Sequence, residues 1–251
     1  MTETLSLRAK IEQSPMGAYQ WMIVVMAAIM NLLDGFDVLA LAFTATAIRG
    51  EFGLTAIELG YLLSAGLFGM TAGSLFLAPL ADKIGRRPLL LMAVSLSAIG
   101  MLGSAFISQY QWLGFWRVIT GLGVGGILVG TNVITSEYSS RKWRSFAISV
   151  YAAGFGIGAV LGGMFAVMLQ GEYGWRSVFL AGAILTGLLL VVLFIWLPES
   201  IDFLTSKQPK NAEVRLNLIA KKIGLAGDWK LPAKVEKVKN KLPISQLFSE
   251  K

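Results

Sequence analysis

The chain contains no cysteine and no histidine, and only 15% of its 251 residues are charged. The absence of cysteine excludes disulfides, thiolate metal sites and cysteine nucleophiles. The absence of histidine removes the commonest general base and metal ligand, and the side chain that usually titrates near neutral pH. We therefore expect no cofactor and no metal, and any proton chemistry must use carboxylates.

Apolar residues are abundant instead: 55% of the chain is hydrophobic, and 28 residues are glycine. Soluble domains carry about 25% charged residues, and apolar stretches of ~20 residues indicate membrane-spanning helices. Six stretches are long enough, with only short polar segments between them. They are about Trp21–Ala47, Ile57–Leu80, Pro88–Ile107, Gln111–Thr135, Phe146–Leu169 and Trp175–Leu197.

The first stretch follows Arg8 and Lys10 and could be mistaken for a secretory signal. It continues past Asp37 to Ala47, however, and no A-x-A-like cleavage site ends it. A signal peptide has a shorter apolar region and such a site. We therefore interpret residues 21–47 as a retained first span.

Lysine and arginine are distributed unevenly among the connecting segments. Segments that are rich and poor in these residues alternate, and the rich ones are the N-terminus, the loops after the second and fourth spans and the tail. By the positive-inside rule, both termini are cytoplasmic. The net charge of +7 therefore belongs to the cytoplasmic face, where it can contact anionic lipid, and does not indicate a nucleic-acid partner.

Three regions follow from this distribution. Residues 1–18 form a cytoplasmic N-terminus, 19–199 a bundle of six transmembrane helices, and 200–251 a basic cytoplasmic region that is partly helical. Within the last region, residues 212–223 have a weak helical pattern. A short surface helix and a solvated linker are both compatible with it.

Only three charged residues lie well inside a span: Asp34, Asp37 and Arg117. A charge at the bilayer centre costs about 2.5–3.5 kcal/mol, and usually marks a functional residue that faces the bundle interior or water. The spacing of three places the two aspartates on one helix face. At 1.5 Å per residue, Asp37 and Arg117 reach similar depths, so they can pair. The pair could be purely structural, but two acids and one base leave one carboxylate to carry a proton.

Glycines recur at four-residue spacing in the fourth and fifth spans. Such patterns let helix backbones approach closely, which predicts a packing role. The positions are Gly121, Gly125, Gly154, Gly158 and Gly162.

Several motifs resemble those of the major facilitator superfamily. The loop after the second span, LADKIGRR, resembles G-x-L-A-D-x-x-G-R-(R/K), with alanine at the leading glycine. An E-x6-R spacing, a P-E-S sequence and R-x3-G-x-G at Arg117 follow in the expected order. The resemblance assigns a cytoplasmic gate to Asp82, Gly85, Arg86, Arg87, Glu137, Arg144 and Glu199. We expect the three arginines to lie within reach of the two glutamates.

The D-G-F-D sequence at residues 34–37 resembles one branch, the aromatic acid:proton symporters. The resemblance implies that Asp34, Asp37 and Arg117 serve proton coupling and substrate binding. The fifth span lacks the proline of the antiporter motif G-P-x-x-G-G, which favours a symporter. Which aspartate carries the proton stays open.

The resemblance covers residues of about 15–205, which correspond to six of the superfamily's twelve spans. It implies an all-α membrane fold, the N-terminal six-helix half, with three-plus-three inverted repeats. The chain could be a truncated product, a fragment or the product of a frameshifted gene. A lone half offers one wall of the cavity, so we expect Asp34, Asp37 and Arg117 to face lipid, a second copy or an open groove.

The predicted function is proton-coupled import of benzoate- or hydroxybenzoate-like carboxylates across the bacterial inner membrane. The expected partners are this substrate, the proton, the lipid bilayer and either a C-terminal six-helix half or a second copy. The alternatives are another organic-anion or sugar porter of the same superfamily, or a truncated product inactive alone. A membrane enzyme is disfavoured because no serine or metal constellation is recognisable.

Overall fold

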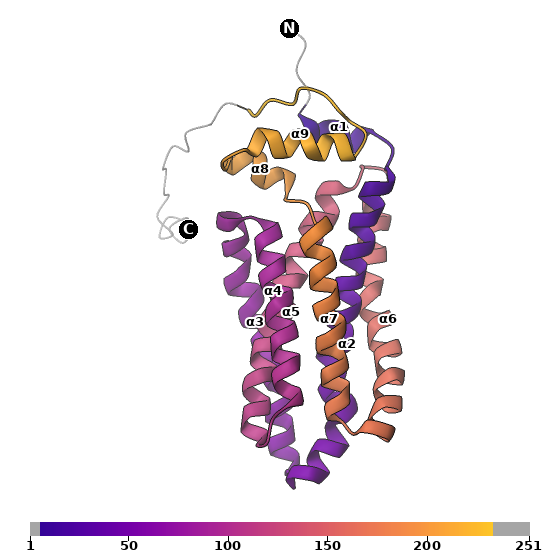
Figure 1. Ribbon diagram of the computed structural model, residues 1–251, viewed down its shortest axis with the longest axis vertical. Helices are drawn as coiled ribbons and strands as arrows, with labels where there is room; N and C mark the ends of the chain where they lie inside the picture. Colours follow the sequence, from indigo (N-terminus) through magenta and orange to yellow (C-terminus); the bar gives the residue numbers. More distant parts are fainter. Residues whose placement is uncertain (1–5, 233–251) are drawn as a thin grey trace, which may run out of the picture.

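The computed structural model describes residues 6–232, and over this range the chain folds into nine helices without a strand (Figure 1). The helices are α1 (Leu7–Gln13), α2 (Ala18–Phe52), α3 (Ala56–Ile84), α4 (Arg86–Ala105), α5 (Tyr110–Tyr138), α6 (Arg144–Tyr173), α7 (Arg176–Trp196), α8 (Ile201–Lys207) and α9 (Ala212–Lys222).

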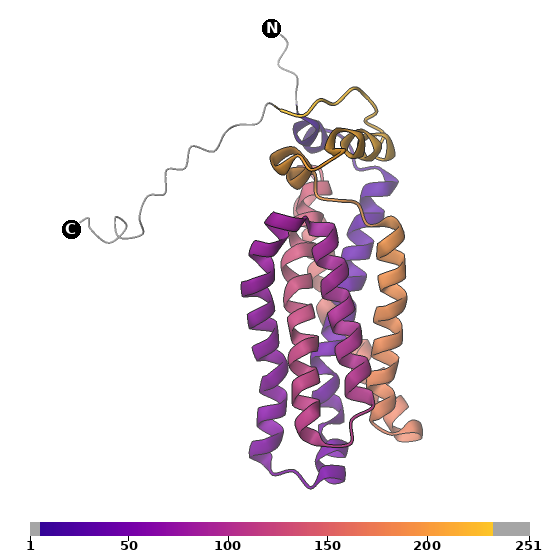
Figure 2. The same cartoon turned by 60° about the vertical axis from the view of Figure 1, so that its left-hand side comes forward.

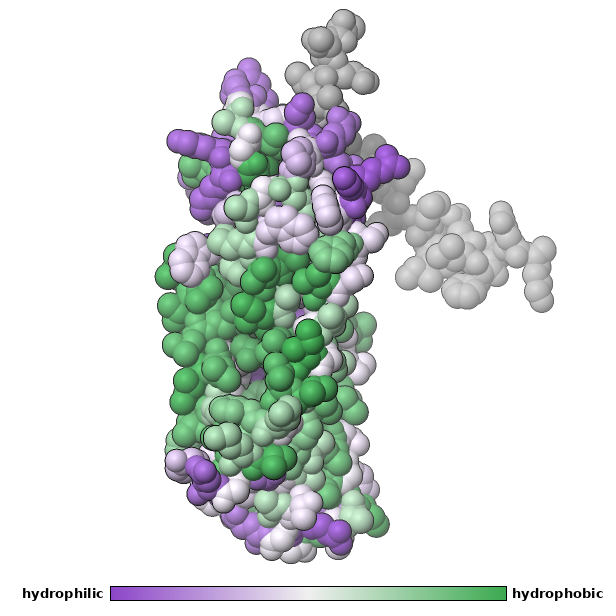
Figure 3. Space-filling model, turned by 90° about the vertical axis from the view of Figure 1, so that its right-hand side faces the viewer, coloured by the Kyte–Doolittle hydropathy of each residue, from purple (hydrophilic) through white to green (hydrophobic). Residues whose placement is uncertain are grey.

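Within the described range, six helices, α2 to α7, are long and apolar enough to cross a membrane. Each corresponds to one of the six predicted spans, although several extend beyond the apolar stretch. The 35 residues of α2 give it a length of ~50 Å, which exceeds the ~30 Å hydrocarbon core of a bilayer. On the face that Figure 3 shows, hydrophobic residues cover the middle of the bundle and hydrophilic residues lie at both ends.

Short connections join the long helices because their ends carry strong stop and start signals. Helix α2 ends at Phe52 and is capped by Gly53, whose φ of 63° is in the left-handed region that glycine adopts without strain. Thr55 then caps α3 by accepting from Glu58 N, while the Glu58 side chain accepts from Thr55 N. This reciprocal capping box satisfies two amide groups that the first turn leaves without helical partners.

The packing of the long helices contains an internal repeat. Helix α2 packs along α6, and α3 packs along α5 to a similar extent. If α2, α3 and α4 are taken as the counterparts of α5, α6 and α7, the interface of α2 with α6 corresponds to the interface of α5 with α3. Because α2 begins at the end of the bundle where α5 finishes, the two triplets have opposite directions (Figure 1). This is the inverted three-plus-three arrangement that the sequence predicts.

The glycines at four-residue spacing lie at these two interfaces. A Cβ atom at Gly158 of α6 would overlap the main chain of Leu32 on α2, and one at Gly154 would meet Ala28 O. On α5, Gly121 faces the main chain of Gly66 in the same way. A Cβ atom at Gly125 would overlap Met70 O, and one at Gly162 would overlap the Phe36 ring. Larger side chains would push the helices apart.

Two hydrophobic clusters fill the bundle, one above the other. The first, with Met30 and Leu90 among its members, continues into α1 and α9; the second, with Phe36 and Met101, fills the far end. Helices α1, α8 and α9, which we call the cap, lie across one end of the bundle (Figures 1 and 2). The D-G-F-D sequence of α2 lies where the two clusters meet.

Candidate functional site

Asp34, Asp37 and Arg117 are buried inside the six-helix bundle, with exposed fractions of 3%, 0% and 3%. None of them is exposed to lipid or available to a second copy, so those two expectations are wrong; of the three alternatives, an open groove agrees best, because Asp37 and Arg117 line a pocket. Neighbouring helices supply polar partners to Asp37 and Arg117, and a charge held by such partners away from lipid avoids most of the cost of the bilayer interior.

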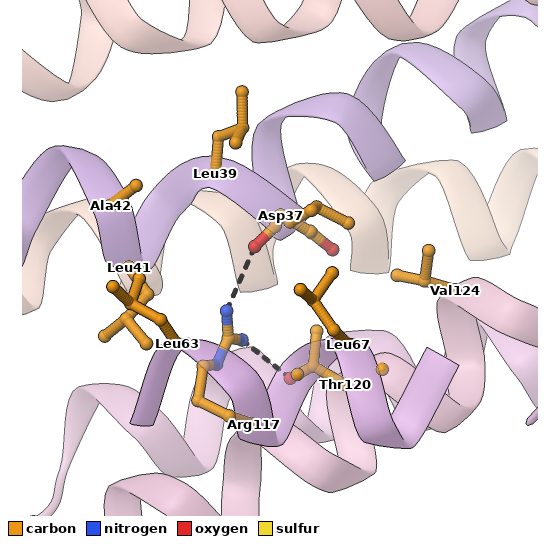
Figure 4. A pocket seen from close by; sticks show the side chains of 12 residues that line it. Asp37, Leu39, Leu41, Ala42, Leu63, Leu67, Arg117, Thr120 and Val124 are labelled. Atoms are coloured by element: carbon orange, nitrogen blue, oxygen red, sulfur yellow. Dashed lines mark hydrogen bonds between the residues drawn. The ribbon is translucent and has the colours of Figure 1, made fainter. Parts of the chain in front are cut away.

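Asp37 is held by two neighbouring helices. Ser97 Oγ of α4 donates a hydrogen bond of 2.6 Å to Asp37 Oδ2. The Arg117 guanidinium of α5 donates to the main-chain carbonyl of Asp37 at 3.0 Å rather than to its carboxylate (Figure 4). The other carboxylate oxygen, Oδ1, is buried without a hydrogen-bond partner among the described residues. A buried, unpartnered carboxylate oxygen is a position where a proton is favourable.

Arg117 makes its other contacts with neutral groups. Its NH2 atom lies 2.7 Å from Thr120 Oγ1 and 2.9 Å from Met101 Sδ. The guanidinium lies over the Phe179 ring, 5.1 Å from the centroid, in a cation–π contact. Its Nε atom is buried and has no hydrogen-bond partner in the described part of the chain. Within residues 6–232 the positive charge is thus surrounded by neutral partners and forms no ion pair.

Asp34 lies one turn from Asp37 on α2 and is also buried. Its Oδ2 atom is also buried without a partner within residues 6–232. Nearby on the same helix, Asn31 Nδ2 donates to Tyr151 O on α6 at 2.8 Å. The site therefore contains two carboxyl groups, each with a buried oxygen that has no hydrogen-bond partner among the described residues.

A pocket of about 140 Å³ opens beside Asp37, Arg117 and Thr120. Figure 4 shows these polar groups at its inner side, with Leu63 and Leu67 of α3 in front of them. Most of the wall is apolar. The pocket can accommodate a small molecule with one anionic group directed at Arg117 and an apolar body against the leucines.

The predicted gate residues form a second site where the cap meets the bundle. Glu199 Oε1 accepts hydrogen bonds from the amides of Arg86, Arg87 and Ser200 at 2.8–3.0 Å. Gly85, which precedes Arg86, has a φ of 104°, and a Cβ atom there would lie against the Glu199 carboxylate. Only glycine fits this position without strain.

Glu137 is 1% exposed, and its carboxylate accepts hydrogen bonds from Ser200 Oγ at 2.8 Å and from the amide of Ile201 at 2.9 Å. The Arg86 side chain lies 3.7 Å from the Glu137 carboxylate and 3.3 Å from Asp82. The structure therefore brings together six of the seven gate residues.

Arg144 is the exception among the gate residues. Its guanidinium pairs with Glu12 of α1 at 2.6 Å, not with Glu137 or Glu199. Glu12 and Ser97 are site residues that the sequence does not reveal. A single glutamate in a polar terminus and a serine in an apolar span carry no motif, and only the fold brings them to their partners.

The fold and the buried charges define a multi-pass helical membrane protein. Residues 27–250 match the family model of the Major Facilitator Superfamily. The chain belongs to this family.

The comparisons also identify curated relatives and solved structures. The chain is 34% identical over 241 residues to a gallate transporter from Pseudomonas putida, covering 96% of this chain and 54% of the relative. It is 34% identical over 216 residues to the 4-hydroxybenzoate transporter PcaK of the same organism, covering 86% and 48%. The xylose transporter XylE from E. coli superposes with a TM-score of 0.71 at 22% identity, covering 80% of this chain and 55% of XylE. The chain thus spans about half the length of these relatives.

Proposed function

We propose that the chain is the N-terminal half of a proton-coupled importer of aromatic carboxylates. The observation that carries the proposal is the buried arrangement of Arg117 and Asp37 beside a pocket with apolar walls. Two relatives that are each 34% identical are named as transporters of gallate and 4-hydroxybenzoate, which combine an aromatic ring with a carboxylate. The arginine matches the carboxylate of such a substrate, and the leucines match its ring.

The proposed mechanism starts from the charge of the site. Two ionised aspartates and one arginine carry a net negative charge, which repels an anion. Protonation of one aspartate makes the site neutral. Because Arg117 is bound to a main-chain carbonyl and a hydroxyl, a substrate carboxylate can replace these neutral acceptors with a stronger, charge-assisted pair. Proton and anion then cross the membrane together.

We further propose that a second six-helix half completes the site. The pocket of about 140 Å³ is smaller than the ~300–1,000 Å³ typical of ligand sites. The coverage of about half of each relative supports the same view. In this superfamily, substrates bind between two halves that move against each other. A second copy of this chain is the other candidate for the missing wall.

The proposed location is the bacterial inner membrane with both termini in the cytoplasm. Residues 1–18 and 200–251 would then lie on the cytoplasmic side, and 19–199 would form the membrane bundle. The alternation of basic and non-basic loops supports this orientation. The cap and the gate residues would lie on the cytoplasmic side, which fits a gate that closes the inner end of the pathway.

The test is uptake of radiolabelled 4-hydroxybenzoate in cells that express this chain together with a relative's C-terminal half. An imposed pH gradient provides the driving force. Asp37→Asn keeps the shape but cannot exchange a proton, so we expect proton-driven accumulation to be lost. Asp228→Asn, at an exposed position, is the matched control and retains uptake. Normal accumulation in Asp37→Asn would overturn the proton-carrier role.

A second variant tests substrate recognition. Arg117→Lys keeps the positive charge but loses the planar group that binds a carboxylate through two hydrogen bonds. We expect a large increase in KM for 4-hydroxybenzoate, and an unchanged KM would assign Arg117 to structure alone.

Ser97→Ala tests the support of Asp37. A hydrogen bond to a charged group contributes ~1.5–3 kcal/mol, so its loss should slow uptake by ~10- to 100-fold. Ser95→Ala, on the same helix, removes only a bond to the Leu91 carbonyl and should leave uptake unchanged. Equal effects of the two substitutions would argue against a specific role for Ser97.

A further inference from the structure

A second pocket, far from the buried charges, lies where the cap meets the end of α7. Its volume is about 260 Å³, and it is open to the outside. Trp196 and Leu197 at the end of α7 form one side, and Leu218 of α9 forms another. The pocket shares Arg87 and Glu199 with the gate, but the proposed transport step does not use it.

Three basic side chains line this pocket: Arg87 of α4 and Arg215 and Lys222 of α9. None of them forms an ion pair within residues 6–232. Glu199 is the acidic residue in the lining, and one of its oxygens already accepts three amide hydrogen bonds. The pocket therefore has an excess of positive charge that a bound anion would balance.

The basic side chains are held in place by contacts to their surroundings. Arg87 NH2 donates to Phe194 O at 2.7 Å, and the guanidinium lies 5.8 Å from the centroid of the Phe194 ring. Lys222 Nζ lies 5.3 Å from the centroid of the Tyr19 ring. These contacts fix Arg87 and Lys222 at the wall of the same pocket.

Exposed apolar residues continue outward from the pocket. Ile195 and Trp196 on α7 are 60% and 48% exposed, and Leu218 on α9 is 56% exposed. On α9, Arg215, Leu218 and Lys222 share one face because they are three and four residues apart. A helix that combines basic and large apolar side chains on its exposed face is typical of one that lies in a membrane interface.

We propose that this pocket binds the headgroup of an anionic phospholipid. The phosphate would contact Arg87, Arg215 and Lys222, and the acyl chains would lie along Ile195 and the outer face of α7. A lipid satisfies both features at once, the cationic pocket and the apolar surface beside it. A free phosphate ion satisfies only the first.

The test measures lipid binding to the full 251-residue chain in detergent micelles by native mass spectrometry, and does not depend on transport. The probes are phosphatidylglycerol, phosphatidylcholine with the same acyl chains, and inorganic phosphate. The double variant Arg215→Gln/Lys222→Gln removes two charges from the pocket. The control Lys210→Gln/Lys221→Gln removes two exposed charges from the same part of the cap, outside the pocket.

We expect the pocket variant to bind phosphatidylglycerol about 30-fold more weakly, from about fivefold for each basic residue near an anionic lipid surface. The control variant should retain the affinity of the parent, and Arg215→Gln alone should lose about fivefold. Circular dichroism establishes that all variants keep their helix content. Equal losses in the two double variants would show non-specific attraction and overturn the proposal. So would equal affinity for phosphatidylcholine, or displacement of the lipid by an equal concentration of inorganic phosphate.

Discussion

Two glycines on α6, Gly156 and Gly158, provide a direct test of the close packing between α2 and α6. Both are helical, and neither has a positive φ. A Cβ atom at Gly158 would overlap the main-chain carbonyl of Leu32 on α2. A Cβ atom at Gly156 would have no atom within 4 Å. The substitutions Gly156→Ala and Gly158→Ala therefore add the same methyl group to the same helix in opposite environments.

The expected effects follow from two opposing contributions. Replacing glycine with alanine inside a helix stabilises it by up to ~1 kcal/mol, and this gain applies to both positions. At Gly158 the added methyl meets main-chain atoms, which cannot move aside by a change of rotamer. Overpacking of this kind typically costs ~1–3 kcal/mol. We therefore expect the free energies of unfolding of the two variants to differ by ~1–3 kcal/mol, with Gly158→Ala the less stable.

The assay is unfolding of the purified chain in mixed micelles by increasing SDS, followed by tryptophan fluorescence. The difference between the variants is more informative than either value because the propensity gain cancels. If Gly158→Ala were as stable as Gly156→Ala, the close approach of α2 and α6 would not exist in the folded protein.

Two further predictions concern the junction of the cap with the bundle. Tyr138 Oη donates a hydrogen bond of 2.6 Å to the Glu199 carbonyl in a buried position. The substitution Tyr138→Phe should therefore lower the free energy of unfolding by ~1 kcal/mol. The control Tyr173→Phe, at a position that is 71% exposed, should leave it unchanged. The hydrogen bond from Arg144 lowers the pKa of Glu12 below its ordinary value of 4.5, so the contact is present above that pH and is lost as the pH falls through the lowered pKa. Hydrogen exchange of α1, corrected for the intrinsic effect of pH, should therefore accelerate below about pH 4.5. The Glu12→Gln substitution should accelerate this exchange already at pH 7. A pH-independent exchange rate in the parent would refute the role of the Glu12–Arg144 pair.

The sequence predicts the bundle well because a membrane simplifies the problem. Every backbone polar group in the hydrocarbon region needs an internal partner, so a long apolar stretch can only be a helix there. The six predicted spans match α2 to α7 for this reason. The helix ends are less well predicted. Helix α2 begins at Ala18 and ends at Phe52, beyond the apolar stretch 21–47, because capping signals rather than hydropathy determine where a helix stops.

The candidate site is only partly predictable from the sequence. The cost of a charge in the bilayer singles out Asp34, Asp37 and Arg117 without a structure. Their partners do not follow from the same argument. Arg117 binds the carbonyl of Asp37, and Ser97 binds the carboxylate, because the rotation of each helix decides which group is in reach. The same limit explains Arg144, which pairs with Glu12 across 132 positions of the chain.

Packing and chemistry meet in the four residues 34–37 of α2. A Cβ atom at Gly35 would overlap the Phe155 carbonyl on α6, so this glycine allows a close approach of the two helices. The Phe36 ring lies against Gly162 of α6, while the flanking aspartates, Asp34 and Asp37, are buried beside the site. A substitution at Gly35 would therefore separate α2 from α6 and displace both carboxylates at once. Its effect on uptake could not distinguish packing from proton coupling. Gly158 faces Leu32 of α2, two residues before Asp34, whereas a Cβ atom at Gly156 would have no atom within 4 Å. Because the comparison of Gly156→Ala with Gly158→Ala measures unfolding and not uptake, it tests the packing role apart from proton coupling.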